Sequence, residues 1–260
     1  MVDPSSDAPP GLSWRPLLTI VAAGLLAGLL DFGLGEMTYE FFLPEVVAQP
    51  LGGAVSMRPT LETVARADSR NSSLTFGGMG GLLGLILGLV GGLMRRSIAS
   101  AAKAGLVGLV LGASLGAVLP LVLIEPYRRM QVVRNSDDLF VPIGMHALLW
   151  GPLGAIAGLA YGIGRGRRGR ALANLVGGLL GAVLATMVYD VVGAAVAPLG
   201  GTSDAISKTW ATRLLARLLV PIGSALGIAL GDAMASPAPI PPADRPTPAD
   251  PPAAPLATGD

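Results

Sequence analysis

The chain has 260 residues, of which 52% are hydrophobic and 13% are charged, with 37 glycines and 22 prolines. Soluble domains carry about 25% charged residues, so this composition excludes an ordinary soluble domain and indicates a polytopic membrane protein. The absence of cysteine and the single histidine exclude disulfides, a cysteine nucleophile and a multi-histidine metal site. The net charge of +1 does not favour nucleic acid as a partner, and we expect no metal and no cofactor.

Six apolar stretches are long enough to cross about 30 Å of hydrocarbon, which takes about 20 residues of helix. Continuous apolar runs without strand alternation indicate helices, because lipid offers the backbone no other hydrogen-bond partner. The predicted fold class is therefore an all-α membrane protein. In chain order the expected transmembrane helices cover residues 17–35, 76–94, 104–124, 140–164, 171–196 and 214–235.

The segments outside these spans are predicted to form two tails and a long outer loop. Residues 1–16 form an N-terminal tail, and residues 236–260, with nine prolines, form a disordered tail. Residues 37–75 form a long outer loop in which residues 60–70 have the pattern of a short amphipathic helix. Tryptophan and tyrosine near the predicted boundaries indicate an aromatic belt, made of Trp14, Tyr39, Tyr127, Tyr161, Tyr189 and Trp210.

The two shortest connections carry only basic charge. They contain Arg95, Arg96 and Lys103 after the second span, and Arg165, Arg167, Arg168 and Arg170 after the fourth. By the positive-inside rule both connections are cytoplasmic, which puts both termini in the cytoplasm. We expect an integral protein of a bacterial-type inner membrane.

Parts of the sequence resemble one another. Residues 81–112 align with residues 151–181 at a shift of about 70, and the first span aligns with part of the fifth. These matches predict three copies of one helical hairpin, formed by spans 1 and 2, 3 and 4, and 5 and 6. The alternative is that Gly/Leu/Ala-rich spans resemble one another by composition alone.

Glycines recur every fourth residue along most spans, which places them on one stripe of each helix where a neighbouring backbone can approach closely. They are Gly24 and Gly28; Gly80, Gly84, Gly88 and Gly92; Gly108, Gly112 and Gly116; Gly154, Gly158 and Gly162; Gly177 and Gly181; and Gly223, Gly227 and Gly231. With GGMGGLLGLILGLVGG as the clearest match, the chain resembles glycine-zipper membrane segments. This resemblance implies close helix packing within one bundle; outward-facing stripes would instead build a homo-oligomer or a pore.

Asp31 and His146 are the candidate intramembrane polar site. Asp31 shares the stripe of Gly24 and Gly28, so it faces packed protein, and His146 lies at a similar depth on the same side. The two could form a carboxylate–imidazole pair, which would suit a proton-coupled or water-lined path because histidine changes charge near neutral pH. The alternative is a neutral or snorkelling aspartate and a histidine bonded to a helix carbonyl.

The sequence contains a second, remote candidate site. Ser114 lies in a G-x-S-x-G pattern, and together with His146 it resembles the intramembrane serine and histidine of rhomboid proteases, although on different spans. Our main expectation is a non-enzymatic membrane scaffold or partner-binding subunit, in contact with the bilayer and with further copies of itself or another membrane protein. The alternative is a small transporter or channel using Asp31 and His146, and the remote alternative is an intramembrane serine hydrolase.

Overall fold

The computed structural model describes residues 14–51, 54–134, 139–166, 168–197 and 199–235. In chain order its elements are α1 (Trp14–Met37), β1 (Val46–Leu51), β2 (Ala54–Pro59), α2 (Leu61–Met94), α3 (Ile98–Arg134), α4 (Phe140–Arg165), α5 (Arg168–Val196) and α6 (Trp210–Met234). All six helices are long and apolar enough to cross a membrane, so the chain is an all-α integral membrane protein. The predicted tails lie outside the described residues, except that residues 14–16 begin α1.

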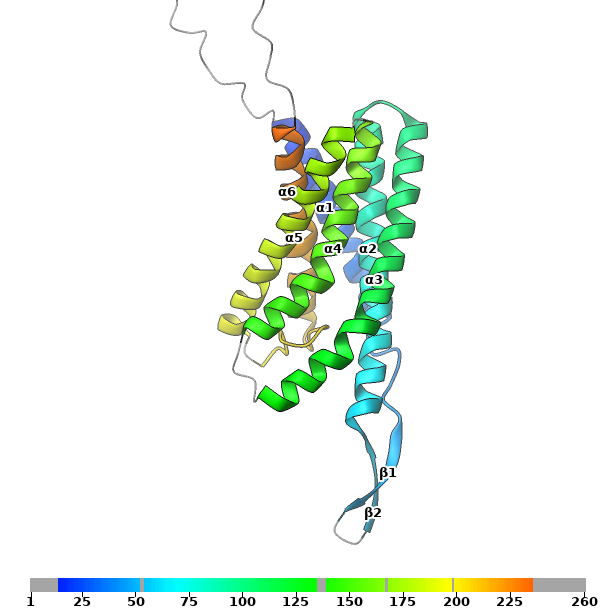
Figure 1. Cartoon of the computed structure of the whole chain (residues 1–260), viewed down its shortest axis with the longest axis vertical. Coiled ribbons are helices and arrows are strands. Elements are labelled where there is room, and N and C mark those ends of the chain that lie inside the picture. Colours follow the sequence, from blue (N-terminus) through cyan, green and yellow to red (C-terminus); the bar gives the residue numbers. More distant parts are fainter. Residues whose placement is uncertain (1–13, 52–53, 135–138, 167, 198, 236–260) are drawn as a thin grey trace, which may run out of the picture.

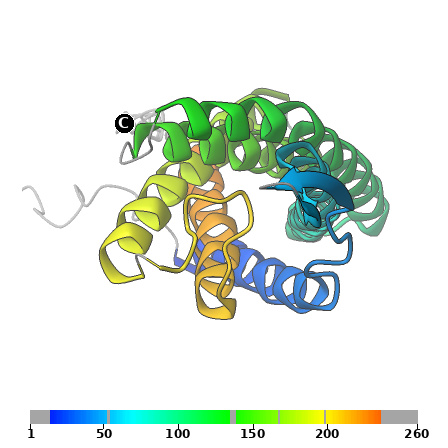
Figure 2. The ribbon, with the colours of Figure 1, turned by 90° about the horizontal axis from the view of Figure 1, so that it is seen from below.

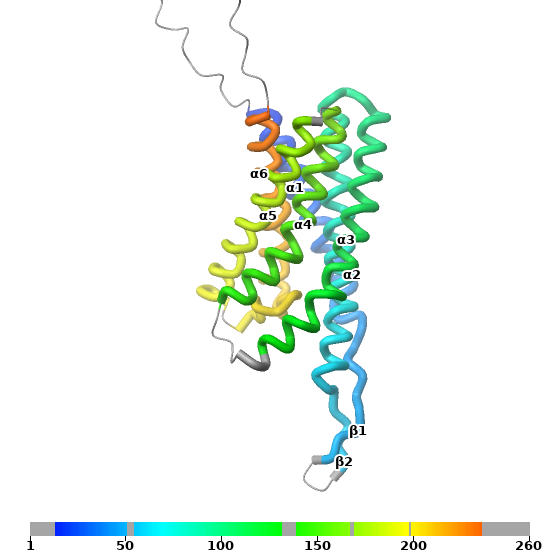
Figure 3. Tube along the Cα trace, in the orientation of Figure 1, coloured from blue at the N-terminus to red at the C-terminus, as the bar shows by residue number. Residues whose placement is uncertain are grey.

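The six helices lie side by side in one bundle (Figure 1). Helix α4 contacts α2, α3, α5 and α6, while α1 lies against α6 and α2 (Figure 2). We call the end with the α2–α3 and α4–α5 turns the arginine end, because Arg95, Arg96 and Arg165 lie there. The opposite end, from which β1 and β2 project, is the hairpin end. Helix α1 begins and helix α6 ends at the arginine end (Figure 3).

Helix α2 is longer than the predicted span, and residues 60–70 are not a separate helix but its first turns. Thr60 caps the helix: its hydroxyl oxygen accepts a hydrogen bond from the Thr63 N–H at 3.1 Å, and the Thr63 hydroxyl accepts one from the Thr60 N–H at 3.0 Å. Polar side chains in these turns have partners, such as Arg66 and Glu62 at 2.7 Å. Hydropathy locates the apolar part of a helix, so it missed this polar beginning.

Helix α3 also extends beyond its predicted span, to Arg134. Pro120 and Pro126 lie inside it, and each lacks the N–H that an α-helical hydrogen bond needs. Its last turns bend away from the bundle axis and cross the hairpin end (Figures 1 and 2). The bend brings Tyr127 and Arg128 over the interior of the bundle.

The predicted outer loop contains regular structure that the sequence analysis missed. Strands β1 and β2 pair antiparallel, with Val47 opposite Arg58 and Gln49 opposite Ser56. The hairpin projects beyond the bundle along its axis and continues into α2 (Figure 1). Its side chains are largely exposed, including Val55 at 75% and Met57 at 61%.

The glycines of the predicted stripes lie at contacts between helices. A Cβ added at any of them would collide with atoms of a neighbouring helix. Gly80 faces Gly112 and Gly84 faces Gly108 across α2 and α3, while Gly154 faces Gly178 across α4 and α5. In the same way Gly177 faces Gly227 and Gly181 faces Gly223 across α5 and α6, and Gly24 and Gly28 face Pro221 and Arg217. The stripes of α2 and α3 thus face each other, as do those of α5 and α6, while the stripes of α1 and α4 face other residues of neighbouring helices.

Two apolar clusters fill the bundle. One contains Leu83, Leu87 and Ile228 and lies toward the arginine end, and the other contains Phe76, Leu149 and Trp150 and lies toward the hairpin end. The prediction of an aromatic belt is wrong for three tyrosines, Tyr127, Tyr161 and Tyr189, which are at most 5% exposed. Their hydroxyl groups serve interior hydrogen bonds, whereas Trp14 and Trp210 are exposed.

The closest helix pairs are α2 with α3, α4 with α5, and α5 with α6. The first two pairs are joined by the turns at the arginine end, so this packing does not follow the predicted division into hairpins 1–2, 3–4 and 5–6. The threefold repeat therefore stays a prediction.

We expect Gly84→Leu to destabilise the bundle, because the new side chain would meet the Gly108 backbone. Overpacking of this kind costs about 1–3 kcal/mol. The measurement is the thermal unfolding midpoint of the purified protein in mild detergent. Gly33→Leu is the matched control, since no atom lies within 4 Å of a Cβ added there. Equal midpoints for the two variants would contradict the role assigned to the glycine contacts.

Candidate functional site

A buried ion pair joins α1 to α6. The Arg217 Nη1 donates hydrogen bonds to Asp31 Oδ2 at 2.5 Å and to the Asp31 carbonyl oxygen at 2.7 Å. Both side chains are at most 5% exposed. The guanidinium occupies the space beside Gly35, where a side chain would collide with it. A buried charge in the membrane needs such a partner, so this contact compensates Asp31 within the protein.

A second ion pair lies about one helical turn nearer the hairpin end. Arg213 binds Glu36 through two hydrogen bonds, from Nε at 2.6 Å and from Nη2 at 2.7 Å. Its Nη1 donates to the carbonyl oxygens of Ser207 and Lys208, and its Cζ lies 3.7 Å from the centre of the Tyr39 ring. Arg213 therefore connects α6 both to the end of α1 and to the segment that precedes α6.

His146 joins α4 to α5 and to the segment before α6. Its Nδ1 lies 2.7 Å from Asp190 Oδ1, and its Nε2 lies 3.1 Å from the Asp204 carbonyl oxygen. Because a carbonyl oxygen only accepts, Nε2 must carry a hydrogen. The contact between Nδ1 and the carboxyl group then needs one more proton, on either His146 or Asp190. The contact is buried, since His146 and Asp190 are at most 2% exposed.

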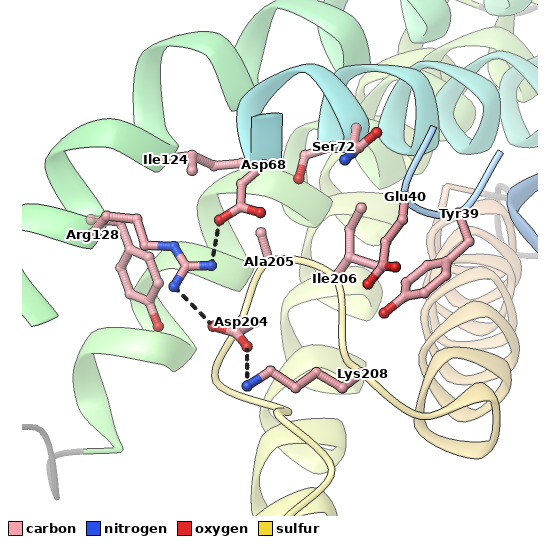
Figure 4. Close-up of a pocket in the computed structure, with 12 residues that line it drawn as sticks. Tyr39, Glu40, Asp68, Ser72, Ile124, Arg128, Asp204, Ala205, Ile206 and Lys208 are labelled. Carbon is pink, nitrogen blue, oxygen red and sulfur yellow. Dashed lines mark hydrogen bonds and ion pairs between the residues drawn. The ribbon is translucent and has the colours of Figure 1, made fainter. Parts of the chain in front are cut away.

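Charged side chains from α2, α3 and the segment before α6 contact one another at the hairpin end of the bundle. Arg128 of α3 lies between Asp68 of α2, at 2.5 Å, and Asp204, at 3.5 Å; Lys208 lies 3.6 Å from the same Asp204 (Figure 4). The Tyr127 hydroxyl donates to the Ser203 carbonyl oxygen. These contacts hold residues 203–208 inside the mouth of the bundle.

A polar cavity of about 120 Å³ lies beside this charge cluster (Figure 4). Residues from α2, α3 and the segments after α1 and before α6 line it, among them Tyr39, Glu40, Asp68 and Arg128. A second cavity, of about 20 Å³, reaches Arg213 and Arg217. Ala205 and Ile206 line both cavities, so the segment that contains them lies between the polar cavity and the buried arginines.

The arginine end has a smaller polar cluster. Asp232 of α6 lies 3.4 Å from Arg165 and 3.5 Å from Arg170, and the Tyr161 hydroxyl donates to it at 3.5 Å. Leu83, Leu87 and Ile228 are fully buried in the apolar cluster between the two ends. Within the described residues, no group of three or more His, Asp or Glu side chains is arranged to hold a metal ion.

The predicted pairing of Asp31 with His146 is wrong: Asp31 binds Arg217, and both ring nitrogens of His146 contact Asp190 and Asp204. The depth of each residue was a reasonable inference, but depth does not fix which helices are neighbours. The structure also does not support a Ser114–His146 pair, because Ser114 is exposed on α3 whereas His146 is fully buried with other partners.

Two arginines that form ion pairs inside the bundle escaped the sequence analysis. Arg217 lies inside the predicted sixth span and Arg213 directly before it, four residues apart and thus on one face of the helix. An arginine inside an apolar span is itself a signal, since it needs a partner in the protein or at the interface. Pairing these arginines with the acidic residues of other spans would have suggested Asp31 as a partner.

Comparisons with known proteins give no relative: no protein-family model matches the chain, and no curated protein or solved structure is significantly similar to it. The fold and its polar clusters therefore define the class of protein, a six-helix integral membrane protein with charged groups paired inside the bundle.

We expect Asp31→Asn to destabilise the protein by about 3–5 kcal/mol, because it leaves the Arg217 charge buried without its partner. Unfolding by SDS in mixed micelles measures this loss. Glu62→Gln breaks an exposed pair with Arg66 and should cost less than about 1 kcal/mol. The double variant Asp31→Leu/Arg217→Met should recover part of the loss, since it removes both charges. A loss as small as that of the control would contradict the role assigned to the buried pair.

Proposed function

We propose that the protein is a non-enzymatic membrane scaffold or partner-binding subunit that presents the β1–β2 hairpin to a partner protein. The observation that carries this proposal is the exposed hairpin itself. A two-stranded hairpin is marginally stable alone in water, and its outer edges offer unpaired N–H and C=O groups. Val46, Val55 and Met57 add exposed apolar side chains, between 52% and 75% exposed. Such a hairpin gains most from a partner that adds a strand to it.

The interior of the bundle supports a scaffold for a different reason. Asp31 is 2% exposed and compensated by Arg217, and the apolar cluster around Leu83 and Leu87 separates the polar groups of the two ends. A scaffold needs such a closely packed core because it must hold one shape, whereas a channel needs a water-filled pathway.

For orientation we extend the proposal to a bacterial-type inner membrane. The arginine-rich turns favour the cytoplasm by the positive-inside rule, which would put the hairpin on the outer side. Helix α1 begins and helix α6 ends at the arginine end, so this orientation would put both termini in the cytoplasm. Further copies of the chain or another membrane protein would then complete the assembly.

The scaffold proposal predicts partner contact at the hairpin. A photoreactive phenylalanine analogue at Val55 or Met57 should give a specific protein adduct in membranes of the source cells, while the same residue at Val118, on the exposed surface of α3, should not. Mass spectrometry of the adduct distinguishes a second copy of the chain from another protein. Absence of a protein adduct at both hairpin positions would overturn the proposal.

A small transporter or channel is the second candidate, and two observations favour it. His146 and Asp190 form a buried hydrogen bond, and the polar cavity is separated from Arg217 by the segment with Ala205 and Ile206. Movement of that segment would join the two cavities. The candidate therefore uses Asp31 and His146 through their separate partners, Arg217 and Asp190.

Single cysteines distinguish the two candidates, since the chain has none of its own. We expect Asp31→Cys and His146→Cys to resist a membrane-impermeant thiol reagent added from the hairpin side, because both positions are at most 2% exposed. Val55→Cys is the positive control and should react fully. Rapid labelling at positions 31 and 146 would instead establish a water-filled path and favour transport.

A further inference from the structure

A wide apolar groove runs along the outer surface between α5 and α6, with a volume of about 850 Å³. Every side chain that lines it is aliphatic or methionine, and the remaining lining residues are glycines. Four leucines are 42% to 61% exposed along it, and they are Leu180, Leu184, Leu226 and Leu230. The groove is therefore a lipid-facing surface with a defined shape.

The shape follows from the glycine contacts. At Gly177 with Gly227, and at Gly181 with Gly223, the backbones of α5 and α6 touch, so no side chain fills the floor. The leucines on either side stand higher and form the walls. A hollow between two walls of this kind fits a linear apolar molecule.

The groove has a charged end. It reaches Gly169 and Met234 at the arginine end, and Gly169 lies in the first turn of α5, between Arg165 and Arg170 in the sequence. The nearby carboxylate, Asp232, is shared between Arg165 and Arg170. Arg95 adds another guanidinium, which packs against Gly166. Positive charge thus exceeds negative charge where the apolar groove meets the membrane surface.

We propose that this groove binds an anionic phospholipid of the leaflet at the arginine end, with one acyl chain along the groove and the phosphate at the α4–α5 turn. From Gly169 to Val188 the groove follows about 28 Å of helix, close to the whole hydrocarbon thickness. One acyl chain covers about half of this length, from Gly169 to about Leu180. Basic pockets between helices on the cytoplasmic side of a membrane bind anionic head groups. The orientation proposed above puts the arginine end on that side, and the inference rests on it. The inference does not depend on the proposed scaffold function.

The test measures which lipid stays on the full-length protein. The purified chain is loaded from micelles with equal amounts of phosphatidylglycerol and phosphatidylcholine that carry the same acyl chains, and retained lipid is counted by native mass spectrometry. We expect one retained phospholipid per chain, with phosphatidylglycerol preferred at least about fivefold, which corresponds to one arginine contact.

Variants distinguish the contribution of the groove to lipid retention from the contribution of the arginine charge. Leu180→Trp and Leu226→Trp should fill the groove and lower retention about fivefold or more, whereas Leu111→Trp on α3, with similar exposure, should leave it unchanged. Arg95→Gln should lower the preference for phosphatidylglycerol and keep total retention. The thermal unfolding midpoint of each variant shows that the bundle is intact.

Three results would overturn the inference. They are equal retention of the two phospholipids, retention that the tryptophan variants do not alter, and a lipid-free dimer that Leu180→Trp dissociates. The last result would assign the groove to a second copy of the chain. None of them bears on partner contact at the hairpin, so the two proposals fail independently.

Discussion

Close backbone approach is the constraint on which the rest of the structure depends. Lipid competes fully for apolar contact, so helices in a membrane gain little from hydrophobicity and must gain from packing. Gly80, Gly84 and Gly112 let the backbones of α2 and α3 touch over several turns. Other glycines do the same between α4 and α5 and between α5 and α6. The positions of the charged side chains follow from the neighbours that these contacts select.

The buried charges illustrate this dependence. Arg217 reaches Asp31 because α1 has glycines at positions 28 and 35, which leave room for the α6 backbone and for the guanidinium. A side chain at position 28 would collide with the α6 backbone, and one at position 35 would displace the Arg217 guanidinium, so either would disturb the contact with Asp31. The small residues therefore support the electrostatics: they are what allows an arginine and an aspartate to lie together in a medium that tolerates neither alone.

The sequence predicted the helices well and their partners poorly. Six spans follow from hydropathy because lipid imposes length and polarity on each helix separately. The polar beginning of α2, the end of α3 and the β1–β2 hairpin lie outside the predicted apolar spans, where no such rule applies. Likewise the depths of Asp31 and His146 could be counted along the chain, but Arg217 and Asp190 become their partners through packing of helices far apart in sequence.

The length of α2 has a mechanical consequence. Its 34 residues measure about 51 Å, of which about 30 Å suffice to cross hydrocarbon. The remaining turns form a helical post that carries the strands beyond the apolar span. Since the post continues without a break into the bundle, a load applied to the strands would be transmitted along α2 to the glycine contacts with α3, rather than absorbed by a flexible tether.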